Sequence, residues 1–242
     1  MKLVRAHARA LTVELLRHPA YVVPTLALPT LFFLAFAGPR SGGHPAVRMA
    51  TFAGFAAIGV AFFQFGVGIA VERDSPWERY LRTLPVSLRA RMLARVLSAA
   101  LFATAAAMLV LVAGMGITHA SVAAADWVAL TAMLVAGVVP FALLGIALGY
   151  WAPARAALPI ANLLYLGLAY AGGLWMRPDE LPHAVRALSP FLPSRALGDA
   201  LAASVGGRPL PVRSLLELAA FGCAFAVFAA WGYRRDEGRR YG

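Results

Sequence analysis

The sequence predicts an all-α, polytopic membrane protein with six transmembrane helices. Hydrophobic residues make up 61% of its 242 residues and charged residues only 14%, whereas soluble domains carry about 25% charge. A soluble chain of this length could not bury so much apolar surface in one core. The apolar residues are also collected into long stretches. Lipid is therefore predicted to surround most of the chain.

Six stretches have roughly the 20 apolar residues that are needed to cross a bilayer. We expect transmembrane helices near residues 20–38, 49–71, 96–117, 127–151, 157–176 and 214–233, within a single transmembrane domain of residues 1–242. Pro24 and Pro29 lie in the first stretch, so a kinked helix is expected there. Glycines are frequent in the second stretch, and small residues allow helices to pack closely in lipid.

Residues 1–18 precede the first stretch and carry too many charges to form the apolar core of a signal peptide. Lys2, Arg5 and Arg9 form one helical stripe, and apolar residues form another. This pattern is typical of an amphipathic helix that lies in the plane of the lipid headgroups.

The basic residues lie at the ends of the apolar stretches, so the net charge of +11 does not indicate nucleic-acid binding. If the N-terminus is cytoplasmic, the inner segments carry 15 Lys and Arg residues and the outer segments carry 7. The positive-inside rule then favours a multi-pass protein of the cell membrane with both termini in the cytoplasm. The last outer loop alone carries five arginines.

That loop, about residues 177–213, is the longest connection and contains prolines and short amphipathic runs. A loop of this length with internal helical pattern is usually functional. We expect short external helices over residues 178–206, which lie on the outer leaflet or dip into it.

The densest charge lies between the second and third stretches, on the side predicted to be cytoplasmic. Ser75 can cap a helix, Pro76 suits its first position, and Glu78 completes a capping box. Pro85 disfavours helical geometry at the residue before it. The sequence therefore predicts a short, rigid helix over residues 76–84.

This helix is predicted to have an apolar side and a charged flank. The apolar side carries Trp77, Tyr80, Leu81 and Leu84, and the flank carries Glu78, Arg79 and Arg82. An amphipathic helix with an aromatic anchor can insert into a groove on a partner. The residue pattern leaves open an alternative, in which the helix only anchors Trp77 among the lipid headgroups.

The run "ERDSPWERYLRTLPVSLRARMLARVLSA" resembles the cytoplasmic segment of type-2 ATP-binding-cassette (ABC) exporter permeases. In that family a pattern like E-R-x-x-G-T-x-E-x-L-L-x-T-P-V-S follows the second span. The matching residues are Glu72, Arg73, Leu81, Pro85, Val86 and Ser87. Pro76 and Trp77 replace the usual Gly-Thr, and the second glutamate of the pattern falls on Arg79. The run "LSPFLPSRALGDALAA" is similar to the proline-containing external segment of the same family.

The resemblance implies a subunit of six helices that pairs with a second permease, as a homodimer or a heterodimer, and with two separate ABC ATPase subunits. ATP and Mg would bind to the ATPases, and this chain would bind no cofactor and would not be an enzyme. The cytoplasmic segment would be the coupling helix that docks on the ATPase. The residues expected to couple to the ATPase are Glu72, Arg73, Trp77, Glu78, Arg79, Leu81, Arg82 and Pro85. The expected cargo is a lipophilic or amphipathic compound, such as a drug, an antibiotic, a lipid or a glycan carrier, moved out of the cytoplasm.

The sequence contains no convincing catalytic or metal motif. It has no glycine-rich phosphate loop ending in Gly-Lys-Ser or Gly-Lys-Thr and no H-E-x-x-H pair. The five histidines are scattered, and the single cysteine excludes an internal disulfide framework and a clustered-thiolate metal site.

A few residues within the stretches are candidates for a translocation path or a dimer interface. They are Phe55, Phe62, Gln64, Asn162 and Tyr165. The alternative is that the polar members form hydrogen bonds within one subunit and that the aromatic members face lipid or neighbouring helices. Arg213 and Glu217 are expected to form an ion pair of i,i+4 spacing near the outer surface.

Two other functions stay open. The chain could be a membrane anchor or assembly protein that tethers a cytoplasmic partner without transport, or it could be a secondary carrier. The shortage of ionisable residues within the stretches argues against a proton- or sodium-driven carrier, which usually needs a titratable relay.

Trp77→Ala and Glu78→Ala are each expected to uncouple transport from ATP hydrolysis, because they alter the docking side of the predicted helix. Membrane insertion should stay intact in both variants. The measurement is ATP-driven transport by the assembled complex, and normal transport in both variants would contradict the docking role.

Overall fold

The computed structural model describes residues 2–37, 44–73, 75–76, 88–120 and 122–241. These residues are mostly helical, and no strand occurs among them. Five helices are long and apolar enough to cross a membrane: Pro45–Arg73, Ala90–Thr118, Ala124–Trp151, Ala154–Ala171 and Val212–Glu237. The prediction of an all-α polytopic membrane protein is therefore confirmed.

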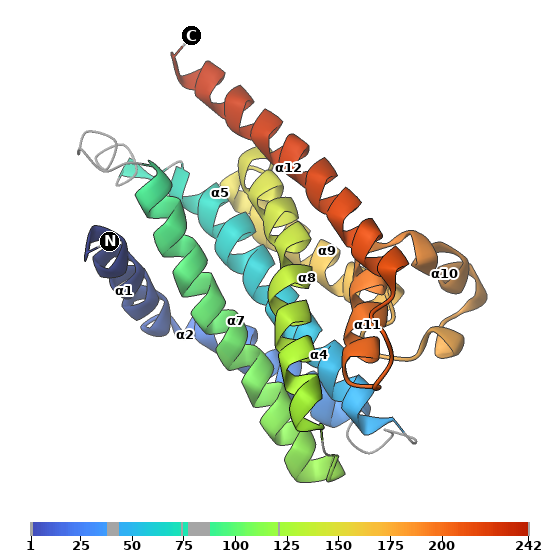
Figure 1. Cartoon of the computed structure of the whole chain (residues 1–242). Coiled ribbons are helices and arrows are strands. Elements are labelled where there is room, and N and C mark those ends of the chain that lie inside the picture. The colour runs from blue at the N-terminus through green and yellow to red at the C-terminus, as the bar shows by residue number, and fades with distance from the viewer. Residues whose placement is uncertain (1, 38–43, 74, 77–87, 121, 242) are drawn as a thin grey trace.

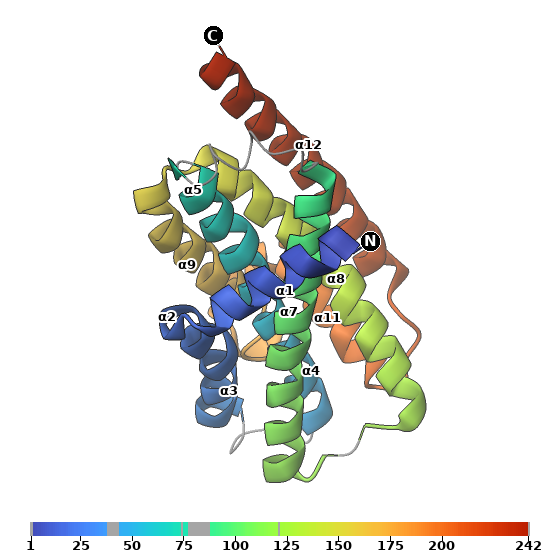
Figure 2. The same cartoon turned by 90° about the vertical axis from the view of Figure 1, so that its left-hand side faces the viewer.

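The N-terminal part of the chain contains a separate helix followed by the first predicted span. Helix α1 (Lys2–Leu16) lies across α7 (Leu88–Thr118), where the Thr12 hydroxyl is 3.2 Å from that of Ser98 (Figure 2). The following run alternates α-helical and π-helical turns: α2 (Pro19–Val22), η1 (Val23–Ala27), α3 (Leu28–Phe32) and η2 (Phe33–Ala37). Its apolar part, Val23–Phe36, is shorter than the five candidate spans.

The helix at the centre of the bundle is α4 (Pro45–Ala61), which continues through the π-helical turn η3 (Phe62–Val67) into α5 (Gly68–Arg73). It packs against α3, α7, α8 (Ala124–Trp151), α9 (Ala154–Ala171) and α11 (Pro193–Ser204). Every residue from Met49 to Ala61 is buried. A helix that is apolar on all sides has no face for water, which agrees with its central position (Figure 1).

Close contact between α8 and the η3–α5 segment depends on glycines. A Cβ atom on Gly145 would lie 2.8 Å from the Ala61 carbonyl oxygen, and one on Gly149 would lie 2.8 Å from the Phe65 carbonyl oxygen. The two glycines are four residues apart and therefore share one face of the helix. Small residues at this spacing let two helix backbones approach closely in lipid.

The segment between α9 and the last helix, α12 (Val212–Tyr241), contains short helices: η4 (Pro178–Glu180), α10 (His183–Leu188), η5 (Ser189–Phe191) and α11. Helix α11 packs against α4, α8 and α12 rather than lying on the surface of the bundle. Leu197 and Leu201 are fully buried. A Cβ atom on Gly137 would lie 2.3 Å from Leu197, and one on Gly54 would lie 2.4 Å from Leu201. The two glycines therefore leave the space that these leucine side chains fill.

The two ends of the bundle are distinct (Figure 1). The end of α5 and the start of α7 lie at the upper end of that view, and the C-terminal end of α12 extends beyond them. The start of α4 and the connection between α7 and α8 lie at the lower end. Opposite ends of the bundle therefore carry the two charged regions described below.

Leu201→Ala is expected to lower the free energy of unfolding by about 2–5 kcal/mol, because it leaves a cavity in the core next to Gly54. The matched control is Leu163→Ala, since Leu163 is 75% exposed on α9 and its loss leaves no internal cavity. Thermal unfolding of both variants in detergent measures the difference. Equal midpoints in the two variants would mean that α11 is not held by this packing.

Candidate functional site

Six of the eight residues predicted to couple to an ATPase lie outside the described residues. These are Trp77, Glu78, Arg79, Leu81, Arg82 and Pro85, and most of the predicted helix over residues 76–84 lies with them. Glu72 and Arg73 are described, and they form the end of α5. Their contacts define how the chain is held at the point where it enters the predicted coupling segment.

Arg73 fastens the end of α5 to α8 and α12. Its guanidinium donates to the carbonyl oxygens of Tyr150, at 2.6 Å, and Ala152, at 3.0 Å, and to the Asp236 carboxylate at 3.1 Å. The last carbonyls of a helix lack intrahelical partners and form the negative end of its dipole. Arg73 therefore satisfies the end of α8 and pairs with an acid on α12 at the same time.

Glu72 fastens the same turn to α7 through Arg95. The Arg95 side chain is only 9% exposed, and it donates to the Glu72 carboxylate and, at 2.8 Å, to the carbonyl oxygen of Gln64. Gln64 lies in the π-helical turn η3, where the usual backbone hydrogen-bond register is interrupted. A Cβ atom on Gly68 would lie 2.8 Å from the guanidinium, so this glycine leaves the space that Arg95 occupies.

Glu72, Arg73, Arg95 and Asp236 together form what we call the ion-pair brace. Two neighbouring residues at the end of α5 thereby hold α7 on one side and α8 and α12 on the other. Charge-assisted hydrogen bonds are shorter and stronger than neutral ones. The low exposure of Arg73, Arg95 and Asp236 limits screening of these bonds, although Glu72 itself is 43% exposed. The brace therefore fixes the orientation of the last turn before residues 74–87.

Aromatic contacts strengthen the junction of α8 and α12 next to the brace. Trp151 stacks on Phe228, with ring centroids 5.0 Å apart, and the Arg235 guanidinium lies 4.6 Å from the Trp151 ring centroid. Gly232 makes room for the indole, because a Cβ atom there would lie 2.6 Å from its nitrogen. The two helices are thus joined side by side at this end.

Three of the residues predicted for a path or an interface lie together inside one chain. The rings of Phe55 and Tyr165 are nearly parallel with centroids 4.5 Å apart, and Phe62 lies 6.5 Å from Tyr165. Trp175 packs edge-on against Phe55 at 5.3 Å. Phe55, Phe62 and Tyr165 are all at most 3% exposed, so in this conformation they form part of the core between α4, η3 and α9.

The two polar candidates differ in their surroundings. Gln64 is 3% exposed, so its side-chain amide lies inside the bundle. Asn162 is partly exposed on α9. The predicted ion pair on α12 is confirmed, because the Arg213 guanidinium lies 2.7 Å from the Glu217 carboxylate.

Sequence reasoning missed Arg95 and Asp236 as site residues. Arg95 enters the sequence analysis only in the count of basic residues in the inner segments, and Asp236 does not enter it, since nothing local in the sequence pairs them with Glu72 and Arg73. The available signal was that an arginine one or two turns into an apolar helix needs an acidic partner. In the described part of the chain, no group of three or more His, Cys, Asp or Glu side chains could hold a metal ion.

The fold and the brace define a multi-pass helical membrane protein with a charged junction beside the segment predicted to be cytoplasmic. The sequence model of the "ABC-2 type transporter" family matches residues 3–205, and the chain belongs to that family. It is also 22% identical over 230 residues to the "Putative transport permease YvfS" of Bacillus subtilis (strain 168). That alignment covers 93% of this chain and 94% of the relative. The chain is therefore a transport permease subunit, and its family in general works with an ABC ATPase.

Arg95→Ala is expected to lower the free energy of unfolding by about 1.5–3 kcal/mol, because it leaves the Gln64 carbonyl and the Glu72 carboxylate without their donor. Arg95→Lys should recover part of the loss, since a lysine keeps the charge but lacks the planar fork. Arg155→Ala is the control, because Arg155 is exposed at the same end of the bundle. Thermal unfolding in detergent tests this, and a midpoint for Arg95→Ala equal to that of the control would contradict it.

Proposed function

We propose that this chain is the membrane subunit of an ABC exporter that moves a lipophilic or amphipathic compound out of the cytoplasm. Two permease subunits pair as a homodimer or a heterodimer, and two separate ATPase subunits bind ATP and Mg. The complex lies in the cell membrane with both termini of this chain in the cytoplasm. The ion-pair brace is the observation that carries the proposal.

The brace gives the predicted coupling segment a firm base. A segment can transmit movement to the bundle only if the residues at its base are held in place. Residues 74–87 follow directly on Glu72 and Arg73 in the sequence. Those two residues hold three other helices through ionic hydrogen bonds. Movement of the segment would therefore be passed to α7, α8 and α12 together.

The helices held by the brace also lie on two sides of the central helix. Helix α4 packs against α7 and against α8, and α8 packs against α12. A displacement at the end of α5 would act on both sides of α4. This arrangement supports a transport role for the predicted segment over a simple tether, because a tether needs no rigid connection to the bundle.

Arg73→Gln is expected to lower ATP-driven transport by about tenfold, because losing an ionic hydrogen bond at the base weakens the connection by more than about 1.4 kcal/mol. Asp236→Asn should have a similar effect, and the double variant should be no worse than the more severe single variant if the two residues act as a pair. Transport into inside-out vesicles and ATP hydrolysis are measured on the complex with its ATPase.

Arg155→Gln is the matched control, since it removes the same charge from the same end of the bundle without touching the brace. Hydrolysis that continues while transport falls supports coupling through the brace. If the Arg73→Gln complex transports as much substrate per ATP hydrolysed as the wild type, coupling through the brace is contradicted. If the wild-type complex shows no ATP-driven transport, the alternative function of a membrane anchor is favoured. If transport persists without ATP, the alternative function of a secondary carrier is favoured.

A further inference from the structure

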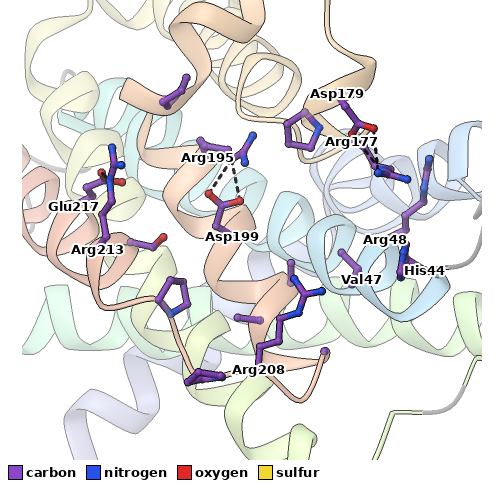
Figure 3. A pocket seen from close by; sticks show the side chains of 18 of the residues that line it. His44, Val47, Arg48, Arg177, Asp179, Arg195, Asp199, Arg208, Arg213 and Glu217 are labelled. Atoms are coloured by element: carbon purple, nitrogen blue, oxygen red, sulfur yellow. Dashed lines mark hydrogen bonds and ion pairs between the residues drawn. The ribbon is translucent and has the colours of Figure 1, made fainter.

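A cleft rich in arginine lies at the end of the bundle opposite the brace. It is formed by the start of α4, the segment from Arg177 to η5, helix α11 and the start of α12, and its volume is about 1170 Å³. Figure 3 shows the charged side chains converging on it from these different parts of the chain. None of these residues belongs to the brace or to the predicted coupling segment.

The cleft carries more positive than negative charge. Six arginines line it, namely Arg48, Arg177, Arg186, Arg195, Arg208 and Arg213. Three carboxylates line it as well, namely Asp179, Asp199 and Glu217. Even with Glu180, which pairs with Arg48 from just outside the lining, the arginines remain in excess.

Most of these arginines are held in place by local partners. The ion pairs are Arg48–Glu180 at 3.1 Å, Arg177–Asp179 at 3.0 Å, Arg195–Asp199 at 2.8 Å and Arg213–Glu217 at 2.7 Å. The Arg186 guanidinium donates to the carbonyl oxygens of Asp179 and Leu181. These four carboxylates neutralise four of the arginines, so the excess positive charge of the cleft comes mainly from Arg186 and Arg208.

Arg208 differs from the others because it has no hydrogen-bond or ion-pair partner in the described parts of the chain. It follows Gly206 and Gly207, and Gly207 adopts a positive φ of 63° that favours glycine. This turn places Arg208 at the edge of the cleft (Figure 3). Its five donors are therefore available to a ligand.

Apolar side chains next to the cleft indicate where a ligand would come from. Leu188 and Phe191 lie within two residues of the lining residue Pro190 in the sequence, and Val212 and Leu216 directly precede the lining residues Arg213 and Glu217 in α12. The four apolar residues are between 65% and 74% exposed. Apolar surface bordering a cationic cleft fits an amphiphile whose chains contact the protein while its head enters the cleft.

We propose that this cleft binds the phosphate-type anionic headgroup of a membrane lipid. Arginine forks match the oxygen geometry of phosphate, and such ionic hydrogen bonds are about twice as strong as neutral ones. A bound anion would also offset the excess positive charge left on Arg186 and Arg208. The site does not depend on the transport function proposed above, because binding to it requires neither ATP nor an ATPase.

Binding of phosphatidylglycerol, phosphatidylcholine and inorganic pyrophosphate to the purified full chain in neutral detergent tests the proposal. Phosphatidylglycerol should bind more tightly than phosphatidylcholine, and rising salt should weaken its binding. Arg208→Gln should raise the dissociation constant for phosphatidylglycerol by about tenfold. Arg208→Glu should raise it further, and Arg208→Lys should keep most of the affinity because it keeps the charge.

Arg155→Gln is the control, since it removes one exposed arginine from the other end of the bundle. Equal affinity for the two lipids, or an equal effect of Arg208→Gln and Arg155→Gln, would overturn the site. Weak pyrophosphate binding supports a lipid-borne anion. Pyrophosphate that binds as tightly as phosphatidylglycerol and displaces it would overturn the lipid as the source and assign the cleft to a soluble anion.

Discussion

The contact between the Arg73 guanidinium and the end of α8 is the interaction on which this end of the fold, predicted to be cytoplasmic, depends. One side chain satisfies two terminal carbonyls and one carboxylate, all from helices distant in the sequence. Without it, the last carbonyls of α8 and the acid on α12 would lose a charged donor at a site where Arg73 and Asp236 are mostly buried. The charged residues Arg73 and Asp236 therefore hold helices in position, in addition to any effect of basic residues on the orientation of the chain in the membrane.

Glycine supplies the complementary constraint within the bundle. In lipid, helices gain little from hiding apolar surface, so close packing must supply the attraction. Gly145 and Gly149 bring the backbone of α8 against η3 and α5, and Gly68 opens the space for Arg95. Close packing and the ion-pair brace consequently converge on the same segment, η3–α5, which leads into residues 74–87. A substitution that separated these helices would also misplace the charged groups.

The fold class could be predicted because long apolar stretches leave few alternatives. The π-helical turns of the first predicted span could not, since proline indicates a kink but not its hydrogen-bond pattern. Glu72 and Arg73 were found from a local motif, whereas Arg95 and Asp236 became recognisable only when folding brought them together across 23 and 163 positions. Aromatic residues such as Phe55 suit a core, a lipid contact or a path equally well, so sequence left their role open. The coupling helix itself stays a prediction, because most of it lies outside the described residues.

The two arginine clusters explain why counting basic residues gave a clear but imperfect topology. At the brace, Arg73 and Arg95 are engaged by carbonyls and carboxylates and hold helices together. At the opposite end, Arg48 of α4 pairs with Glu180 of η4, and Arg195 pairs with Asp199 one turn further along α11, so these arginines take part in the tertiary structure around the cleft. A count of Lys and Arg residues on each side of the membrane gives every arginine the same weight, so it cannot distinguish arginines that hold helices together from those that line the cleft. The arginines of the loop predicted to be external therefore weigh little against the predicted cytoplasmic termini.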